Sequence, residues 1–134
     1  MKKGIIILSL LISAIWIFQS CTKENDLFGD GDVREEYVGD WTANDQCSKQ
    51  TYGVNIVLDE FNSTQVIISN FANLGYSAEA VIAGNSIYVE SQDIGGGYSV
   101  SGNGKLTGSI ITWTSYRFES EGNSADCICT YTEN

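Results

Sequence analysis

The chain has 134 residues, with 7 basic and 17 acidic side chains and a formal net charge of −10 at pH 7. This acidic balance argues against nucleic-acid binding, because contact with a phosphate backbone needs lysine and arginine. The chain contains no histidine, which removes the commonest general base and metal ligand, and no proline, so no strand interior is forbidden on that ground.

The chain begins with a positively charged and then apolar stretch. Lys2 and Lys3 precede an apolar run over residues 5–18, and Ser20 stands directly before Cys21. A positive start, an apolar core and a small residue before a cleavage site are typical of a secretory signal peptide. The run is shorter than the about 20 residues of a spanning helix. Serine followed by cysteine resembles the lipobox of bacterial lipoproteins, in which the cysteine is lipidated and the chain is cut just before it. An ordinary secretory signal is the alternative.

This interpretation divides the chain into three segments. Residues 1–20 would be the signal peptide, residues 21–36 an acidic tether that begins at the lipidated Cys21, and residues 37–134 the folded domain. The tether is too polar to bury a core of its own. Loss of two leader lysines would leave 5 basic and 17 acidic residues, a net charge of −12. The acidic residues after Cys21 resemble the export signal of surface lipoproteins in Bacteroidota. We therefore expect an outer-membrane lipoprotein, facing either the periplasm or the cell surface.

From residue 37 onward, short runs of strand-forming residues alternate with turn formers. The runs cover residues 37–41, 51–58, 64–71, 77–82, 87–91, 98–102, 109–118 and 126–132. Glycine and asparagine stand between them and tolerate the positive φ of tight turns. After the leader, apolar residues do not recur with the 3.6-residue period of a helix over any long stretch, so no helix is predicted there. Eight short strands about ten residues apart predict an all-β barrel or sandwich.

Of these two architectures, a closed up-and-down barrel of eight antiparallel strands is favoured. Every connection is short enough for a hairpin, and closure removes the exposed edges that invite aggregation. A barrel of this size holds side chains or one small ligand. Tyr88, Tyr98, Trp113 and Tyr116 lie near strand centres, so they are candidates to line a ligand cavity, with packing in the core as the alternative.

The first predicted strand contains Gly39-Asp40-Trp41, which resembles the Gly-x-Trp motif of lipocalins. In that family the tryptophan plugs one barrel end and an arginine from a late strand packs over it. The resemblance implies these roles for Trp41 and Arg117, with Gly39 allowing close backbone approach. A wider likeness over residues 66–75, 87–92 and 102–110 resembles a group of small lipocalin-like lipoproteins of Bacteroidota, which has no defined activity.

The remaining cysteines predict a disulfide. Cys127 and Cys129 are two residues apart on a strand and therefore share a face. In a closed barrel the first and last strands are neighbours, so Cys47 could bridge to either of them. The similar lipoproteins have a cysteine three residues before a Thr-Tyr-Thr run, which implies Cys127, with Cys129 as the alternative. A redox or thiolate metal site built from the three cysteines is the competing interpretation, although zinc usually needs a fourth ligand.

These features favour a non-catalytic protein without cofactor or metal. No nucleophile motif has a histidine to activate it. The first hypothesis is a monomeric binding module, attached to the membrane through its lipid, for a small apolar ligand or an envelope partner. The alternative is an acidic inhibitor or interaction protein without a ligand cavity, acting for example on a basic envelope hydrolase. An apolar void of a few hundred cubic ångströms would favour the first hypothesis, and a filled interior the second.

Overall fold

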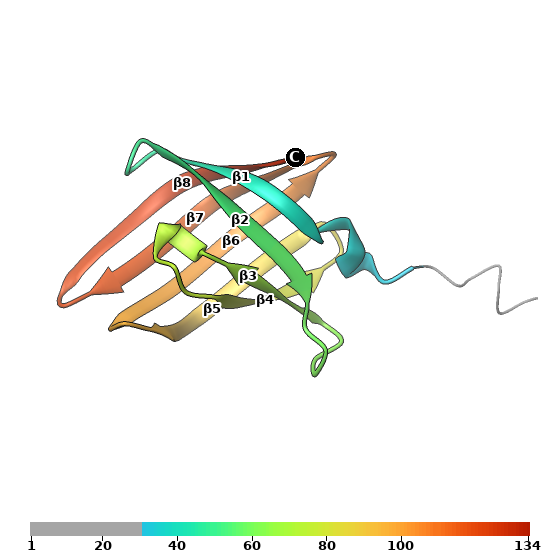
Figure 1. Ribbon diagram of the computed structural model, residues 1–134, viewed down its shortest axis with the longest axis horizontal. Coiled ribbons are helices and arrows are strands. Elements are labelled where there is room, and N and C mark those ends of the chain that lie inside the picture. The colour runs from blue at the N-terminus through green and yellow to red at the C-terminus, as the bar shows by residue number, and fades with distance from the viewer. Residues whose placement is uncertain (1–30) are drawn as a thin grey trace, which may run out of the picture. The chain divides into compact units, whose positions relative to one another are not determined.

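The computed structural model describes residues 31–134, so the predicted signal peptide and Cys21 lie outside the described residues. Each strand pairs antiparallel with the next, and the first pairs with the last, which closes the barrel (Figure 1). The strands are β1 (Gly39–Asp45), β2 (Gln50–Leu58), β3 (Gln65–Ser69), β4 (Ala78–Ala83), β5 (Ser86–Gly95), β6 (Tyr98–Thr107), β7 (Ile110–Ser120) and β8 (Asn123–Glu133). The predicted closed up-and-down barrel of eight antiparallel strands is confirmed.

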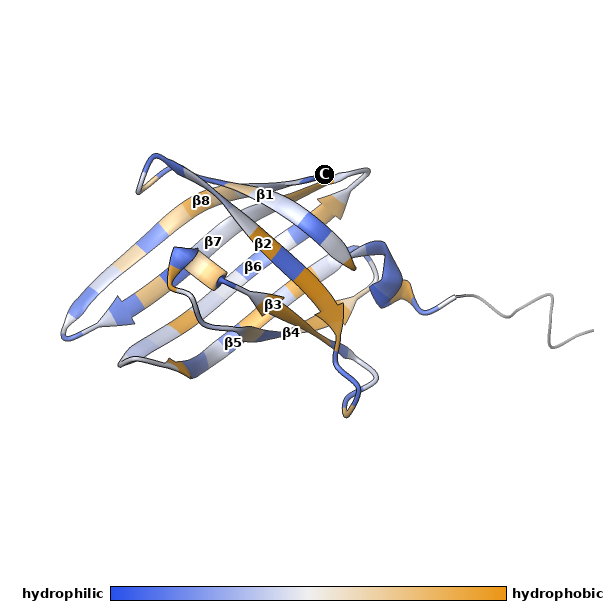
Figure 2. Ribbon diagram, viewed as in Figure 1, coloured by the Kyte–Doolittle hydropathy of each residue, from blue (hydrophilic) through white to orange (hydrophobic). Residues whose placement is uncertain are grey.

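Inward and outward side chains alternate along these strands. On β1, Trp41 and Ala43 are buried, and on β8 the buried residues include Cys127, Cys129 and Tyr131. Successive side chains of a strand point to opposite faces. Figure 2 shows the resulting bands of polar and apolar residues along β2 and β8. This period of two is the pattern from which the barrel was predicted.

Strand β7 contains a bulge that changes which of its side chains face inward. The register against β8 shifts between Trp113 and Tyr116, and the register against β6 shifts between Asn103 and Gly104. In a regular strand, side chains three positions apart would point to opposite faces. The bulge adds a residue, and both Trp113 and Tyr116 are fully buried. Beyond it Arg117 consequently faces outward.

The Gly102-Asn103-Gly104 segment lies inside β6, although such a sequence is typical of a turn. A Cβ atom at Gly102 would lie 3.2 Å from the ring of Trp113, and one at Gly104 would lie 3.1 Å from that ring and 2.9 Å from the side chain of Ile87. The indole therefore packs directly on the backbone of β6, which glycine alone permits. The expectation that this strand ends at residue 102 is wrong for that reason.

The folded unit begins at Val33 rather than at the predicted residue 37. Residues Val33–Glu36 form a short 3-10 helix, η2, in which Arg34 is buried, and Tyr37 directly after it is fully buried. These two side chains bind the last four residues of the predicted tether to the barrel. Within residues 31–134, no helix has the length and apolar character needed to cross a membrane.

The barrel has two distinct ends. The terminal end carries the connections 59–64, 84–85 and 108–109 together with η2 and the C-terminus. The disulfide end carries the connections 46–49, 70–77, 96–97 and 121–122. The 70–77 connection contains a second short 3-10 helix, η3 (Phe71–Asn73), whose Phe71 and Ala72 are buried. The candidate sites below lie at these two ends and in the interior between them.

Candidate functional site

Trp41 closes the terminal end of the barrel. Its side chain is fully buried, and its Nε1 donates a hydrogen bond of 2.8 Å to the carbonyl oxygen of Tyr37. The hydroxyl of Tyr37 in turn donates to the carbonyl oxygen of Gly84 across the same end, at 2.9 Å. The predicted burial of Trp41 is confirmed. Gly39 has a different role from the one expected, because a Cβ there would meet nothing within 4 Å, whereas its φ of 140° favours glycine.

Arg117 does not pack over Trp41. It pairs with Ser101 and Asp126 in the part of the sheet towards the disulfide end, its side chain is 45% exposed, and its Nη2 lies 2.5 Å from Glu119 Oε1. The assignment of Arg117 to the plug is therefore wrong. The physical reason is the bulge of β7, because its extra residue exchanges the inward and outward positions beyond it and turns Arg117 to the outer face.

The arginine that is buried at the terminal end is Arg34. Its Nη1 donates to three backbone carbonyl oxygens of the 59–64 connection and its flank, those of Asp59, Asn62 and Gln65, at 3.1, 2.9 and 2.8 Å. The guanidinium thus holds the β2–β3 connection in one conformation. Sequence reasoning missed this residue because it follows an acidic, glycine-containing segment with no strand pattern of its own.

An aromatic cluster occupies the interior towards the disulfide end. Phe71 lies 4.4 Å from Tyr116 and 5.8 Å from Trp113 between ring centroids, and Trp113 lies 5.3 Å from Tyr131. All four side chains are fully buried. Trp113 and Tyr116, two of the predicted ligand-lining residues, therefore pack on their neighbours as core residues.

The two other predicted lining residues lie elsewhere. Tyr88 is 42% exposed on the outer face of β5, because it stands between the inward residues Ile87 and Val89. Tyr98 begins β6 at the disulfide end, is partly exposed and packs on Tyr76 with ring centroids 6.2 Å apart. Neither residue joins the interior cluster, so the four aromatics do not line a common cavity.

A chain of buried hydroxyl groups crosses the cluster. Tyr52 donates to the hydroxyl oxygen of Tyr116 at 3.1 Å, and the Tyr116 and Tyr131 hydroxyl oxygens lie 2.6 Å apart. The backbone N–H of Ala72 donates to the same Tyr116 oxygen at 2.7 Å. Burial raises the pKa of all three tyrosines well above its usual range. The hydroxyls consequently stay protonated and hold η3 over the barrel mouth.

The hollows at the disulfide end are polar surface features. One of about 320 Å³ lies among the tips of the long hairpins and is lined by Gly97, Ser99 and residues 119–124. A neighbouring hollow of about 200 Å³ includes Ser101, Arg117 and Glu119 on the outer face. A site for a small apolar ligand would instead be concave and mostly apolar.

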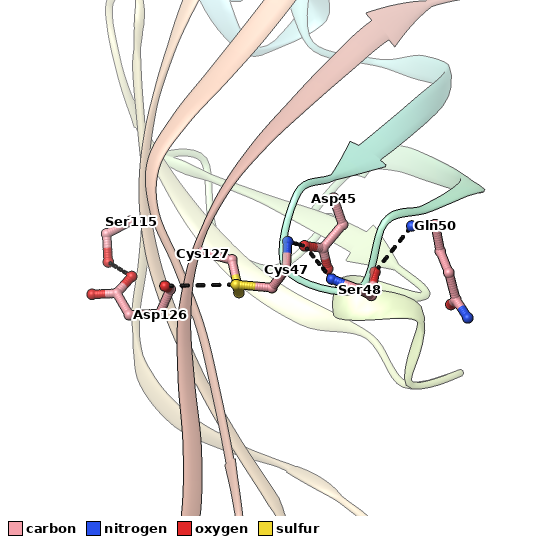
Figure 3. Close-up of a disulfide and its surroundings, with 7 residues drawn as sticks. All are labelled: Asp45, Cys47, Ser48, Gln50, Ser115, Asp126 and Cys127. Atoms are coloured by element: carbon pink, nitrogen blue, oxygen red, sulfur yellow. Dashed lines mark hydrogen bonds between the residues drawn. A yellow bond between two sulfur atoms is a disulfide. The ribbon is translucent and has the colours of Figure 1, made fainter.

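The predicted bridge between Cys47 and Cys127 is confirmed, with an S–S distance of 2.01 Å and a Cα–Cα distance of 5.5 Å (Figure 3). Cys129 is free and buried, and burial raises the pKa of its thiol to about 12. A neutral thiol of this kind is a poor nucleophile and metal ligand. In the oxidised protein, Cys129 therefore behaves as a small core residue.

A buried carboxylate, Asp45, lies beside the disulfide. Its Oδ1 accepts hydrogen bonds from the backbone N–H groups of Cys47 and Ser48, at 2.9 and 3.4 Å (Figure 3). A carboxylate oxygen of Asp45 and the two sulfur atoms of the bridge lie within 4.8 Å of one another. While the bridge is formed, neither sulfur is a thiolate, so these groups do not make a metal site. Asp45 was not predicted, because it ends the first strand without any motif.

Comparisons with protein-family models, with curated proteins and with solved structures found no match for this chain.

Proposed function

We propose that the mature protein is a lipid-anchored, non-catalytic interaction module that binds a cationic envelope partner through its outer surface. The observation that carries this proposal is the filled interior. Trp41, Phe71, Trp113, Tyr116 and Tyr131 are all fully buried inside the barrel. A ligand as large as one of these aromatic rings would have to displace Phe71 from its contacts with Tyr116 and Trp113. A filled interior favours the interaction protein over the carrier of a small apolar ligand.

The charge of the outer surface favours a basic partner. After removal of the leader the chain would have a net charge of −12, and such a field attracts cationic proteins and speeds their association. The hollow of about 320 Å³ at the hairpin tips is rimmed by the exposed side chains of Glu121 and of Glu119, which also pairs with Arg117. We place the contact there, because this face combines a concave shape with acidic groups. A basic hydrolase of the cell envelope has the required chemistry.

The experiment is native mass spectrometry of the lipidated protein purified in mild detergent from its own membrane. We expect a bound basic protein that dissociates as the salt concentration rises, since exposed charge pairs are screened over about 10 Å at 0.1 M salt. The double substitution Glu119→Gln and Glu121→Gln should weaken the complex. Glu35→Gln with Glu36→Gln removes the same charge at the terminal end and is the matched control. A retained small apolar molecule without a protein partner would contradict the proposal.

The lipid anchor has a separate test at Cys21. Replacement of Cys21 by serine should abolish incorporation of a labelled fatty acid and leave the protein either unprocessed or soluble. Acylation of the Cys21→Ser protein would show that the lipobox interpretation is wrong, whatever the outcome for the partner.

A further inference from the structure

We propose that reduction of the Cys47–Cys127 disulfide creates a binding site for one zinc-like divalent ion, with Asp45 and Cys129 completing its ligands. The sequence alone left a thiolate site short of a fourth ligand. The fold supplies this ligand from β1, where Asp45 pairs directly with Cys129 of β8. The inference is independent of the proposed partner binding.

The positions of the donor atoms carry the proposal. One carboxylate oxygen of Asp45, Cys47 Sγ and Cys127 Sγ lie within 4.8 Å of one another. In a tetrahedral zinc site, with Zn–S near 2.3 Å and Zn–O near 2.0 to 2.2 Å, neighbouring donors are separated by about 3.5 to 3.8 Å. The three atoms therefore reach this geometry with small movements once the S–S bond has opened.

Cys129 is the fourth ligand of the proposal, and its Sγ has to move towards the other three donors once the bridge is open, because it lies outside the group that they form. It is fully buried, and it shares the inner face of β8 with Cys127 two residues before it. Side chains of directly opposed residues in an antiparallel pair have Cβ atoms about 4.5 to 5.5 Å apart. Since Cys129 opposes Asp45 in this way, the four donors come from two adjacent strands and the turn that follows β1.

The carboxylate is already oriented. The backbone N–H groups of Cys47 and Ser48 both donate to Asp45 Oδ1 and fix the side chain beside the bridge. Hydrogen bonds of this kind position metal ligands and tune their affinity. Three of the four donor residues, Asp45, Cys127 and Cys129, are at most 3% exposed, so they can surround an ion with little competing water.

The redox step balances with a dithiol as reductant. Cys47 is exposed, so a thiolate of the dithiol can attack Cys47 Sγ and expel Cys127 as the leaving thiolate. The second thiol of the reductant then resolves the mixed disulfide. The reductant ends as a disulfide, and the protein gains two electrons and two protons as the thiols of Cys47 and Cys127. Metal binding releases the thiol protons to solvent.

The test is titration of the full mature protein in detergent with Cd²⁺ as a zinc substitute, before and after reduction with a phosphine. We expect the reduced protein to bind one equivalent, seen as thiolate-to-cadmium absorbance, with its near-ultraviolet circular dichroism spectrum retained or restored. Zn²⁺ should displace the Cd²⁺. Equal binding by oxidised protein, no binding after reduction, or a complex without the folded-state spectrum would overturn the proposal.

Two variants and a control locate the ligands. Loss of an outer-shell partner typically lowers metal affinity by about 10-fold to 100-fold. Asp45→Asn and Cys129→Ser remove a direct ligand, so each should lower the Cd²⁺ affinity by at least as much. Asp126→Asn is the matched control, because Asp126 precedes Cys127 but is exposed and bonded to Ser115 (Figure 3). Cys129→Ser leaves the turn at Asp45 intact and so tests the site even if Asp45→Asn disturbs the fold. Affinities of both variants equal to that of the control would refute the four-ligand site.

Discussion

Replacement of Arg34 by methionine should cost far more stability than the same replacement of Arg117. Arg34 is 8% exposed, and its Nη1 donates to three carbonyl oxygens. The side chain of Arg117 is 45% exposed and pairs with Glu119 in solvent. Methionine keeps most of the apolar stem in both cases, so the comparison isolates the buried guanidinium.

The magnitude follows from the geometry of the bonds. One nitrogen has two hydrogens, so three acceptors correspond to about two full charge-assisted bonds, each worth about 1.5 to 3 kcal/mol. In the Arg34→Met protein the carbonyl oxygens of Asn62 and Gln65 would still accept from the backbone N–H groups of Gln65 and Asp59. These bonds limit the loss of stability. We therefore expect Arg34→Met to lower the free energy of unfolding by about 3 kcal/mol. Arg117→Met should change it by less than about 1 kcal/mol, the usual worth of an exposed ion pair.

The assay is urea unfolding of the mature protein at neutral pH with the disulfide intact, followed by tryptophan fluorescence and far-ultraviolet circular dichroism. Coincident transitions would justify two-state analysis. Arg34→Lys is informative as well, because it keeps the charge but loses the fork of nitrogens and should recover only part of the difference. Equal losses for Arg34→Met and Arg117→Met would refute the conclusion that Arg34 holds the β2–β3 connection.

Further predictions concern the interior. Trp41→Ala should lower the free energy of unfolding by about 3 to 5 kcal/mol, as for other large core truncations, whereas Tyr88→Ala on the outer face should cost less than about 0.5 kcal/mol in the same urea assay. Tyr116→Phe should cost about 2 kcal/mol, because it leaves the buried N–H of Ala72 without its acceptor; a loss no greater than that of Tyr88→Phe would contradict this role. Burial raises the pKa of Cys129 from 9.0 to about 12, so the folded state keeps a proton that the unfolded chain loses above about pH 9. The contribution of this group is therefore fully present below about pH 9, and unfolding at a series of pH values should show it falling by up to about 1.4 kcal/mol per pH unit between there and about pH 12. The buried tyrosines add their own slope above about pH 10, their ordinary pKa, so Cys129→Ser should make the profile shallower most clearly between about pH 9 and 10. An unchanged slope in that interval would show that the thiol does not carry it.

The strands were predictable because their signals are local. Alternating side chains and glycine-rich turns depend on residues near one another in the chain, and they specified eight strands and their order. The Cys47–Cys127 bridge followed from barrel closure, which makes β1 and β8 neighbours, and from the likeness that singled out Cys127. The resemblance to lipocalins itself remains a prediction.

Two of the errors share one physical cause, which is packing between neighbouring strands. The bulge of β7 accommodates Trp113 and Tyr116 on one face, and this reverses Arg117. The same indole needs Gly102 and Gly104 beneath it, which lengthens β6 through an apparent turn. Both features depend on contacts between strands, and the residue pattern within one strand contains no signal for them.

The buried hydroxyl chain suggests why the interior is closed. Phenylalanines could fill the same volume without the need for hydrogen bonds, so the tyrosines at positions 52, 116 and 131 add specificity rather than apolar area. The Tyr116 hydroxyl also accepts a hydrogen bond from the N–H of Ala72, in the β3–β4 connection, where Ala72 itself adopts a positive φ of 55°. A conformation of this kind is unfavourable for a residue with a Cβ and persists only where its surroundings fix it. The network therefore stabilises η3 in the position that places Phe71 on Trp113 and Tyr116. This closed mouth supports the proposal that the protein binds a partner through its outer surface.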